Sequence, residues 1–330
     1  MTGAEHVSWA AQIACQLEIS ALKPGNVTWD RPFSDVAAEQ FLASSAAMGR
    51  AFYGIRKKRI GETVLQAVED TREVAGTNTN LGIILLLSPL AKAAVGGGSE
   101  GLRDKAAVEL RSLTEKDAEE VYRAIRIASP GGLGDSQRYD VNGDPPRITM
   151  LEAMAEAASW DSIAREYVTD FEITFTLGIP SFKKASAEGI PLRDAVTQTF
   201  LVILSVFHDT LIARKRGRRE SESVSAGARH VLQAGVAGSD KWRDAVLEFD
   251  EPLEAPLDVP GPEVTAIAAS EHRTRAPVTQ GRGQQLDELG PQVHGHRAAA
   301  LELAQRRGAG IEVHVWAPER LATAPKRGTT

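Results

Sequence analysis

The sequence has one cysteine, few aromatic residues and no apolar run long enough to cross a membrane. Cys15 alone cannot form a disulfide within the chain, which favours a reducing, cytoplasmic setting. The longest apolar run spans residues 81–95, whereas a bilayer requires about 20 residues, and it contains Pro89 and Lys92. The amino-terminal residues lack the basic segment of a signal peptide. We therefore expect a soluble cytoplasmic protein.

Basic residues are in the minority. Lys and Arg number 38 against 44 Asp and Glu, which gives a formal net charge of −6. This balance argues against general affinity for nucleic acid or an anionic membrane. Histidine is scarce as well, and only His6 precedes His208. A His-Asp metal phosphohydrolase needs further histidines on neighbouring helices, so that class is disfavoured.

Alternating strand patterns are nearly absent, and only residues 310–317 (GIEVHVWA) form a good strand candidate. Helical periodicity dominates to about residue 250 and predicts an all-α fold, a single array of nine to eleven helices. After residue 250 the composition changes, with half of the 16 prolines and a single aromatic residue. We expect residues 1–250 to form the helical domain. Residues 251–330 should form a poorly packed, partly disordered Pro-rich tail with one short helix at 296–305.

Several helices can be placed by their apolar faces and caps. Residues 7–22 predict a helix with Trp9, Ile13 and Leu17 on one stripe, and residues 34–52 predict a second helix capped by Ser34. Capping boxes are expected at Thr114…Asp117 and Thr149…Glu152. Residues 161–178 predict a helix that ends at Gly178 before Pro180, and residues 192–213 predict one long, buried helix.

Four segments between helices carry more polar groups than a connection needs. In the first, LKPGNVTWDRPFSD, Pro24-Gly25 breaks the helix, Lys23 and Asn26 flank the break and could hold an anion, and Asp35 opens the next helix. A simple helix-breaking turn is the alternative. In the second, GTNTNLG, the side chains of Asn78, Thr79 and Asn80 precede an apolar helix. They could bind a nucleotide, although one N-cap is the simpler interpretation.

The third segment, SPGGLGDSQRYDVNGD, is a glycine loop that contains Gly131 and Gly132 and is followed by Asp140. Its glycines permit close approach of the backbone to a ligand, and its carboxylates suit Mg²⁺ held together with substrate phosphates. In the fourth, FHDTLIARKRGRR, His208 and Asp209 lie in an apolar helix that ends in a basic run. A charged pair there needs a partner or a ligand. A surface loop and an interhelical ion pair are the respective alternatives.

In this order the four segments resemble the triphosphoribosyl-dephospho-CoA synthase family, and more closely its environmental and archaeal branch, over residues 7–250. The resemblance is carried by LEISALKPGNV, FSDVAAEQFLASSAAM, GTNTNLGIILLL, PGGLG with DV, and HDTLIARKRG. It implies an all-α transferase that joins C1′ of the ribose of ATP to the 2′-hydroxyl of 3′-dephospho-CoA and expels adenine. The implied partners are Mg-ATP and a dephospho-CoA-like molecule, and whether the chain forms a homodimer is left open.

The resemblance also implies roles for individual residues. Asp35, Asp140 and Asp209 would hold the metal or the ribose, and His208 would assist proton transfer together with Asp35 and Asp209. The nucleotide would be bound by Lys23, Asn26, Asn78, Thr79, Asn80, Gly131, Gly132, Arg214 and Lys215.

The chain also departs from the family pattern. The synthases read GVNTHKG where this chain reads GTNTNLG, so Asn80 and Leu81 replace a His-Lys pair. Phe33 stands near Asp35 where the family has a histidine, and the family's closing NPGTTADL-like segment has no counterpart. Two alternatives therefore stay open, a related transferase with a different acceptor and an inactive helical nucleotide-binding protein.

Overall fold

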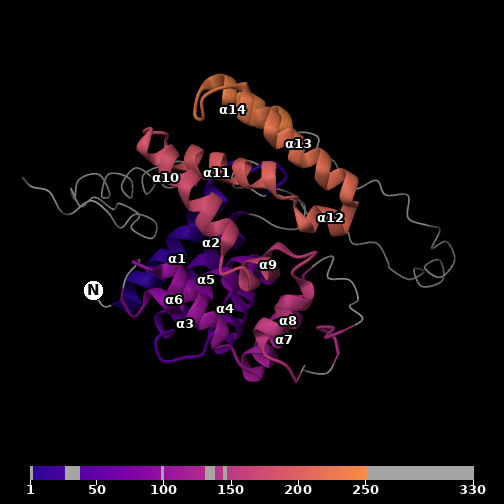
Figure 1. The fold of residues 1–330 in the computed structure, drawn as a ribbon. Helices are drawn as coiled ribbons and strands as arrows, with labels where there is room; N and C mark the ends of the chain where they lie inside the picture. The colour runs from indigo at the N-terminus through magenta and orange to yellow at the C-terminus, as the bar shows by residue number, and fades with distance from the viewer. Residues whose placement is uncertain (1–2, 27–37, 98–99, 131–137, 144–146, 251–330) are drawn as a thin grey trace, which may run out of the picture. The chain divides into compact units, whose positions relative to one another are not determined.

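A computed structural model describes residues 3–26, 38–97, 100–130, 138–143 and 147–250. Among these residues every regular element is helical, which confirms the all-α prediction (Figure 1). The expected tail, with its strand and short helix, lies outside them. No helix in the described ranges is long and apolar enough to span a membrane.

The described chain contains fourteen α-helices and one π-helical turn, more than the nine to eleven helices predicted. The first seven are α1 (Gly3–Ser20), α2 (Ala38–Ala47), α3 (Gly49–Tyr53), α4 (Ile60–Ala75), α5 (Leu81–Ala94), α6 (Leu102–Arg111) and α7 (Glu115–Ala128). The others are α8 (Met150–Ala157), α9 (Ser162–Val168), η1 (Thr174–Gly178), α10 (Ile179–Ala187), α11 (Leu192–Val206), α12 (Thr210–Arg216), α13 (Arg218–Ala234) and α14 (Asp240–Asp250). The number of helices is higher partly because the structure divides three predicted helices, those over 34–52, 161–178 and 192–213.

Helix α1 forms where it was predicted, but the predicted face was wrong. Trp9 is 53% exposed, and the buried stripe is Ser8, Ala11, Cys15 and Ile19. Three of these four side chains are small, which allows α1 to pack closely against α2 and α3. The hydroxyl of Ser8 donates to the carbonyl of Gly49 at 2.8 Å, at the point where the predicted helix over 34–52 divides into α2 and α3.

The predicted helix over 161–178 was also wrong in extent. It stops at Val168, and the chain turns through Asp170 and Phe171, whose φ angles are positive (52° and 57°). It then continues through η1 into α10 instead of ending at Gly178. Pro180 has no N–H to donate to the carbonyl four residues earlier, and the π-helical turn accommodates this, with the amide of Ile179 bonding the carbonyl of Thr174.

Both predicted capping boxes are confirmed. The hydroxyl of Thr114 accepts from the amide of Asp117, whose carboxylate accepts from the amide of Thr114, and Thr149 and Glu152 form the same pair at α8. Asp117 is 3% exposed, and its carboxylate also accepts from the amide of Gly61 at 2.8 Å. This bond joins the start of α7 to the start of α4, and these two helices form the most extensive helix pair among the described residues.

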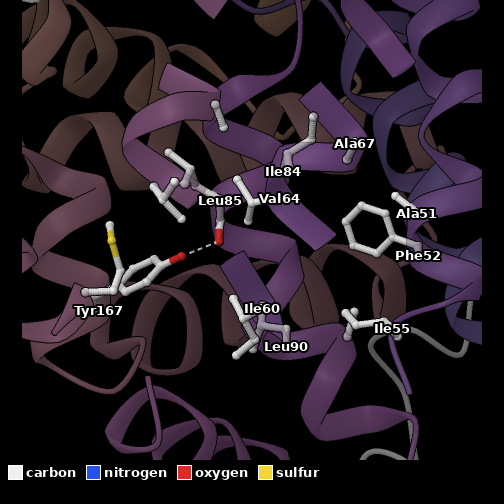
Figure 2. Packing of buried hydrophobic residues seen from close by; sticks show 14 of the residues in the cluster. Ala51, Phe52, Ile55, Ile60, Val64, Ala67, Ile84, Leu85, Leu90 and Tyr167 are labelled. Atoms are coloured by element: carbon white, nitrogen blue, oxygen red, sulfur yellow. Dashed lines mark hydrogen bonds between the residues drawn. The ribbon is translucent and has the colours of Figure 1, made fainter. Parts of the chain in front are cut away.

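The larger core cluster is built from α1 and α3–α9. Figure 2 shows part of this cluster, with Tyr167 of α9 beside Leu85 of α5 and Phe52 of α3 beside Ala51. A second cluster joins α11, α13 and α14 around Leu201, Val231 and Trp242. Helix α9 therefore belongs to the first cluster and α11 to the second, and residues of both helices line the cavity described next.

Candidate functional site

A cavity of about 990 Å³ is bounded by α5, α7, α8, α9, α11 and the segment between α11 and α12. Its wall is largely apolar, with Leu85, Met154, Ile163, Phe200 and Phe207 among the lining residues. Polar groups from three distant parts of the sequence reach the same cavity, namely Asn78, Asp140 and the His208-Asp209 pair. Thus members of three of the four polar segments converge on one pocket.

The fourth segment differs from its prediction. His208 and Asp209 do not lie inside a helix, because α11 ends at Val206 and Asp209 is the N-cap of α12. The Asp209 carboxylate accepts from the amides of Leu211 and Ile212 at 2.8 and 2.9 Å. These bonds satisfy two of the free N–H groups at the start of α12, which explains why the chain breaks in an apolar stretch.

His208 lies at this break, with an exposed side chain that lines the pocket. Its Nδ1 is 3.1 Å from the hydroxyl oxygen of Ser225 on α13. The hydroxyl of Ser221 donates to the carbonyl of Asp209 at 2.8 Å. Two serines one helical turn apart therefore anchor the break, and the imidazole is oriented through one of its two nitrogens.

Asp140 reaches the pocket from the segment after α7. One of its oxygens accepts from the amide of Asn142 at 2.7 Å. The segment is held to α7 by the hydroxyl of Tyr122, which donates to the carbonyl of Tyr139 at 2.7 Å. Burial, and secondarily the Asp140 charge, raises the pKa of Tyr122 to about 12, so this phenol remains a donor at neutral pH.

The second polar segment is divided between the pocket and the core. Asn78 lines the pocket, and its Oδ1 is 3.4 Å from the amide of Leu81 at the start of α5. Thr79 shares a hydrogen bond of 2.5 Å with the hydroxyl of Ser44 on α2. Asn80 is the N-cap residue without a side-chain cap bond, and its buried Nδ2 has no partner among the described residues.

The remaining predicted residues do not line the pocket in the described chain. Lys23 is buried and paired with Glu18, whose Oε1 lies 2.9 Å from its Nζ, and Asn26 is exposed. Neither they nor Thr79 and Asn80 line the cavity. Outside the described parts lie Asp35, Gly131, Gly132 and the side chains of Arg214 and Lys215.

Several lining residues were missed by the sequence analysis. Glu166 of α9, Trp160 before α9, and Arg138 with Tyr139 after α7 all line the pocket, and the Arg138 guanidinium stacks on the Tyr139 ring at 5.2 Å. No local signal marked Glu166, because the neighbouring Arg165 is charged as well and such a pair is typical of a solvated helix face. Among the described lining residues, Arg138 is the one Lys or Arg. The acidic residues are more numerous, namely Asp140, Glu156, Asp161, Glu166 and Asp209.

The carboxylates of the pocket could supply part of the ligands of Mg²⁺ but not a complete site. No group of three Asp, Glu, His or Cys side chains in the described ranges is arranged to hold a metal ion by itself. Asp140 and Asp209 line the same cavity, and each uses an oxygen for backbone amides. This donor set matches Mg²⁺ that is bound by one or two carboxylates and otherwise by water and substrate phosphates.

Fold and pocket define an all-helical protein with a large, mostly apolar pocket, in which carboxylates outnumber Lys and Arg among the described lining residues. Residues 4–256 match the sequence model of the CitG family, described as ATP:dephospho-CoA triphosphoribosyl transferase. This match covers more than half of the chain, and the chain belongs to that family.

Individual relatives agree with this assignment. Proteins assigned as 2-(5''-triphosphoribosyl)-3'-dephosphocoenzyme-A synthase from Pseudomonas aeruginosa and Pseudomonas fluorescens are 31% identical over 221 residues and 27% identical over 219 residues. Each alignment covers 64% of this chain and 64% of the relative. A crystal structure assigned as a triphosphoribosyl-dephospho-CoA synthase from Archaeoglobus fulgidus superposes with a TM-score of 0.51 at 28% identity. That superposition covers 64% of this chain and 87% of the other.

Proposed function

We propose that this protein transfers the triphosphoribosyl group of ATP to the 2′-hydroxyl of 3′-dephospho-CoA, with release of adenine. The observation that carries the proposal is the convergence of Asn78, Asp140 and Asp209 on one pocket in a chain of this family. The cavity, at about 990 Å³, lies at the upper end of the range for small-molecule sites, as two large substrates require.

The chemistry of the wall supports a glycosyl transfer. Loss of adenine from C1′ leaves positive charge on the ribose, and carboxylates in a water-poor site stabilise that charge. Asp140, Glu166 and Asp209 supply such carboxylates. The apolar surface around Phe200, together with the indole of Trp160, suits a flat purine or an alkyl chain. Asn78, which also lines the pocket, would orient the nucleotide through its amide.

Among the described lining residues carboxylates outnumber Lys and Arg, which argues that a triphosphate enters as its magnesium complex. Bare phosphates would be repelled by the acidic lining, whereas a bound Mg²⁺ reverses the local charge. Asp140 and Asp209 would hold the ion jointly with the phosphates. When bound, Mg²⁺ neutralises and orients the triphosphate.

The proposal is tested by incubating the purified chain with ATP, Mg²⁺ and 3′-dephospho-CoA, with adenine followed by liquid chromatography and the conjugate by mass spectrometry. We expect one adenine per conjugate formed, and no adenine without the acceptor. ATP binding without adenine release under any acceptor would contradict the proposal and leave an inactive nucleotide-binding protein.

A second candidate is the same transfer to a different hydroxyl acceptor. Leu81 lines the pocket at the position where the resembling synthases carry a lysine. Loss of this cation favours an acceptor with fewer phosphates. Adenine release that requires such an acceptor and is not supported by 3′-dephospho-CoA would select this candidate.

A further inference from the structure

Glu166 on α9 is buried, with 5% of its surface exposed, and it lines the pocket. Its two carboxylate oxygens differ in their hydrogen bonding. Oε1 accepts from both the amide and the hydroxyl of Thr174, each at 2.8 Å. Oε2 is buried and has no hydrogen-bond partner among the described residues. A buried acceptor oxygen without a partner is costly, and a ligand group that reaches it would remove that cost.

The position of Glu166 is fixed by both ends of its segment. Helix α9 begins at the Asp161 cap, and the amide of Ser162, one turn before Glu166, lies 3.4 Å from the hydroxyl of Thr210 at the start of α12. Tyr167, the next residue, is anchored in the core. After α9, the hydrogen bonds from Thr174 to Glu166 span the turn at Asp170 and Phe171, where the φ angles are positive. Glu166 is therefore held in place on the wall of the pocket that Asp209 also lines.

Burial raises the pKa of Glu166, and hydrogen bonds from Thr174 and the backbone of Ile173 offset part of that effect. The carboxylate of Glu172, in the following turn, adds to the increase. The other ionisable groups on the described pocket wall are Tyr122, Arg138, Tyr139, Asp140, Glu156, Asp161, His208 and Asp209. A carboxylate whose pKa lies closer to neutrality is a better proton acceptor than an ordinary one.

We propose that Glu166 is the catalytic base of the transfer, and that its Oε2 takes the proton from the acceptor hydroxyl. This inference rests on the proposed function. The acceptor oxygen forms its bond to C1′ of the ATP ribose while the bond from C1′ to N9 of adenine breaks, and the electron pair leaves on adenine. The hydroxyl proton passes to Oε2. Adenine then takes a proton from water, and Glu166 returns its own proton to water.

The test compares the wild-type chain with Glu166→Gln under the adenine-release assay. Glutamine keeps an oxygen that can accept from Thr174, so the turn is retained, but it cannot take a proton. We expect kcat to fall about 100-fold or more with KM for ATP within about threefold of wild type. Glu172→Gln, compared at a pH above the acidic limb, is the matched control, since Glu172 lies in the following turn, is half exposed and does not line the pocket. It should keep kcat within about twofold.

A pH profile separates catalysis from a structural role. In the wild type, kcat should fall at low pH as Glu166 becomes protonated, and this acidic limb should be absent in Glu166→Gln. Thr174→Val removes one donor to Oε1 and should move the limb to higher pH, whereas Thr174→Ser should leave it in place. A merely structural contact would change the melting temperature without moving the limb.

The outcomes distinguish this inference from the proposed function. Wild-type adenine release together with a Glu166→Gln kcat within threefold of wild type would overturn the role of Glu166 alone. A wild-type chain that releases no adenine with any acceptor would overturn both. A folded Glu166→Gln protein that has lost kcat and the acidic limb supports the assignment.

Discussion

The hydroxyl of Tyr167 donates to the main-chain carbonyl of Leu85 at 2.8 Å, and both residues are buried (Figure 2). Leu85 is four residues before Pro89, which lies inside α5 and has no N–H to donate. The phenol therefore supplies a donor where the helix lacks one. The bond also attaches α9, which carries Glu166, to α5, which begins beside Asn78.

Tyr167→Phe should destabilise the fold by about 1–3 kcal/mol, because it leaves a buried carbonyl without this donor. Urea unfolding measures the loss. The matched background is Pro89→Ala, which restores a backbone N–H four residues after Leu85. In that background the cost of Tyr167→Phe should be clearly smaller, and an equal cost in both backgrounds would show that the proline is not the reason for the bond.

Sequence reasoning predicted the fold class and the capping boxes, but it missed the breaks inside three of the predicted helices. The capping boxes at Thr114 and Thr149 were predictable because all their partners lie within one turn. The break at Asp209 was missed because an aspartate in an apolar run was interpreted by the hydrophobicity of its neighbours. Its bonds to two amides outweigh continuation of the helix.

The sequence predicted only those pocket residues that lie at helix ends, where polar side chains are conspicuous. Asn78, Asp140 and Asp209 stood out as polar residues at helix ends, and the structure brings them together. Lys23 was expected near phosphates, yet the structure pairs it with Glu18 one turn or so earlier. Glu166 lies inside a helix, and its exposure to a cavity depends on α8, α11 and η1, which no local pattern reports.

Gly61→Ala should destabilise the protein by about 1–3 kcal/mol, since an added Cβ would lie 2.6 Å from the Cα of Asp117. The obstacle is backbone, which cannot move without separating α4 from α7. Gly96→Ala is the control, because a Cβ there meets nothing within 4 Å. Thermal unfolding of the two variants should differ clearly, and similar melting temperatures would show that α4 and α7 tolerate a wider spacing.

Cys15 should be nearly inert in the native protein. Burial, with a smaller effect of the Glu18 charge, raises its pKa to about 12, so little thiolate exists at pH 8. We expect slow reaction with an aromatic disulfide reagent in buffer and fast reaction in concentrated urea. Comparable rates in the two conditions would mean that α1 opens readily and would contradict the packing of its buried stripe.

The pKa of Glu166 has a consequence for stability that is independent of activity. Its folded-state pKa is raised above the ordinary value of about 4.3, so the folded state binds the proton more tightly than the unfolded state. The contribution of Glu166 to stability is present below about pH 4 and decreases as pH rises through its folded pKa. Glu166→Gln lacks this decrease. Its stability relative to wild type should therefore improve from pH 4 to pH 7, and a difference independent of pH would contradict the raised pKa.

Asp209 gives the most direct test of the claim that this pocket is the transferase site. Asparagine caps a helix about as well as aspartate, so Asp209→Asn keeps the start of α12 while removing the charge, and Asp209→Ala removes both. The decisive measurement is adenine release from ATP and 3′-dephospho-CoA, with melting temperatures recorded on the same samples. We predict that Asp209→Asn melts within a few degrees of wild type and releases adenine about 100-fold more slowly. Wild-type turnover in Asp209→Asn would contradict the account, because the carboxylate would then serve only as the cap of α12.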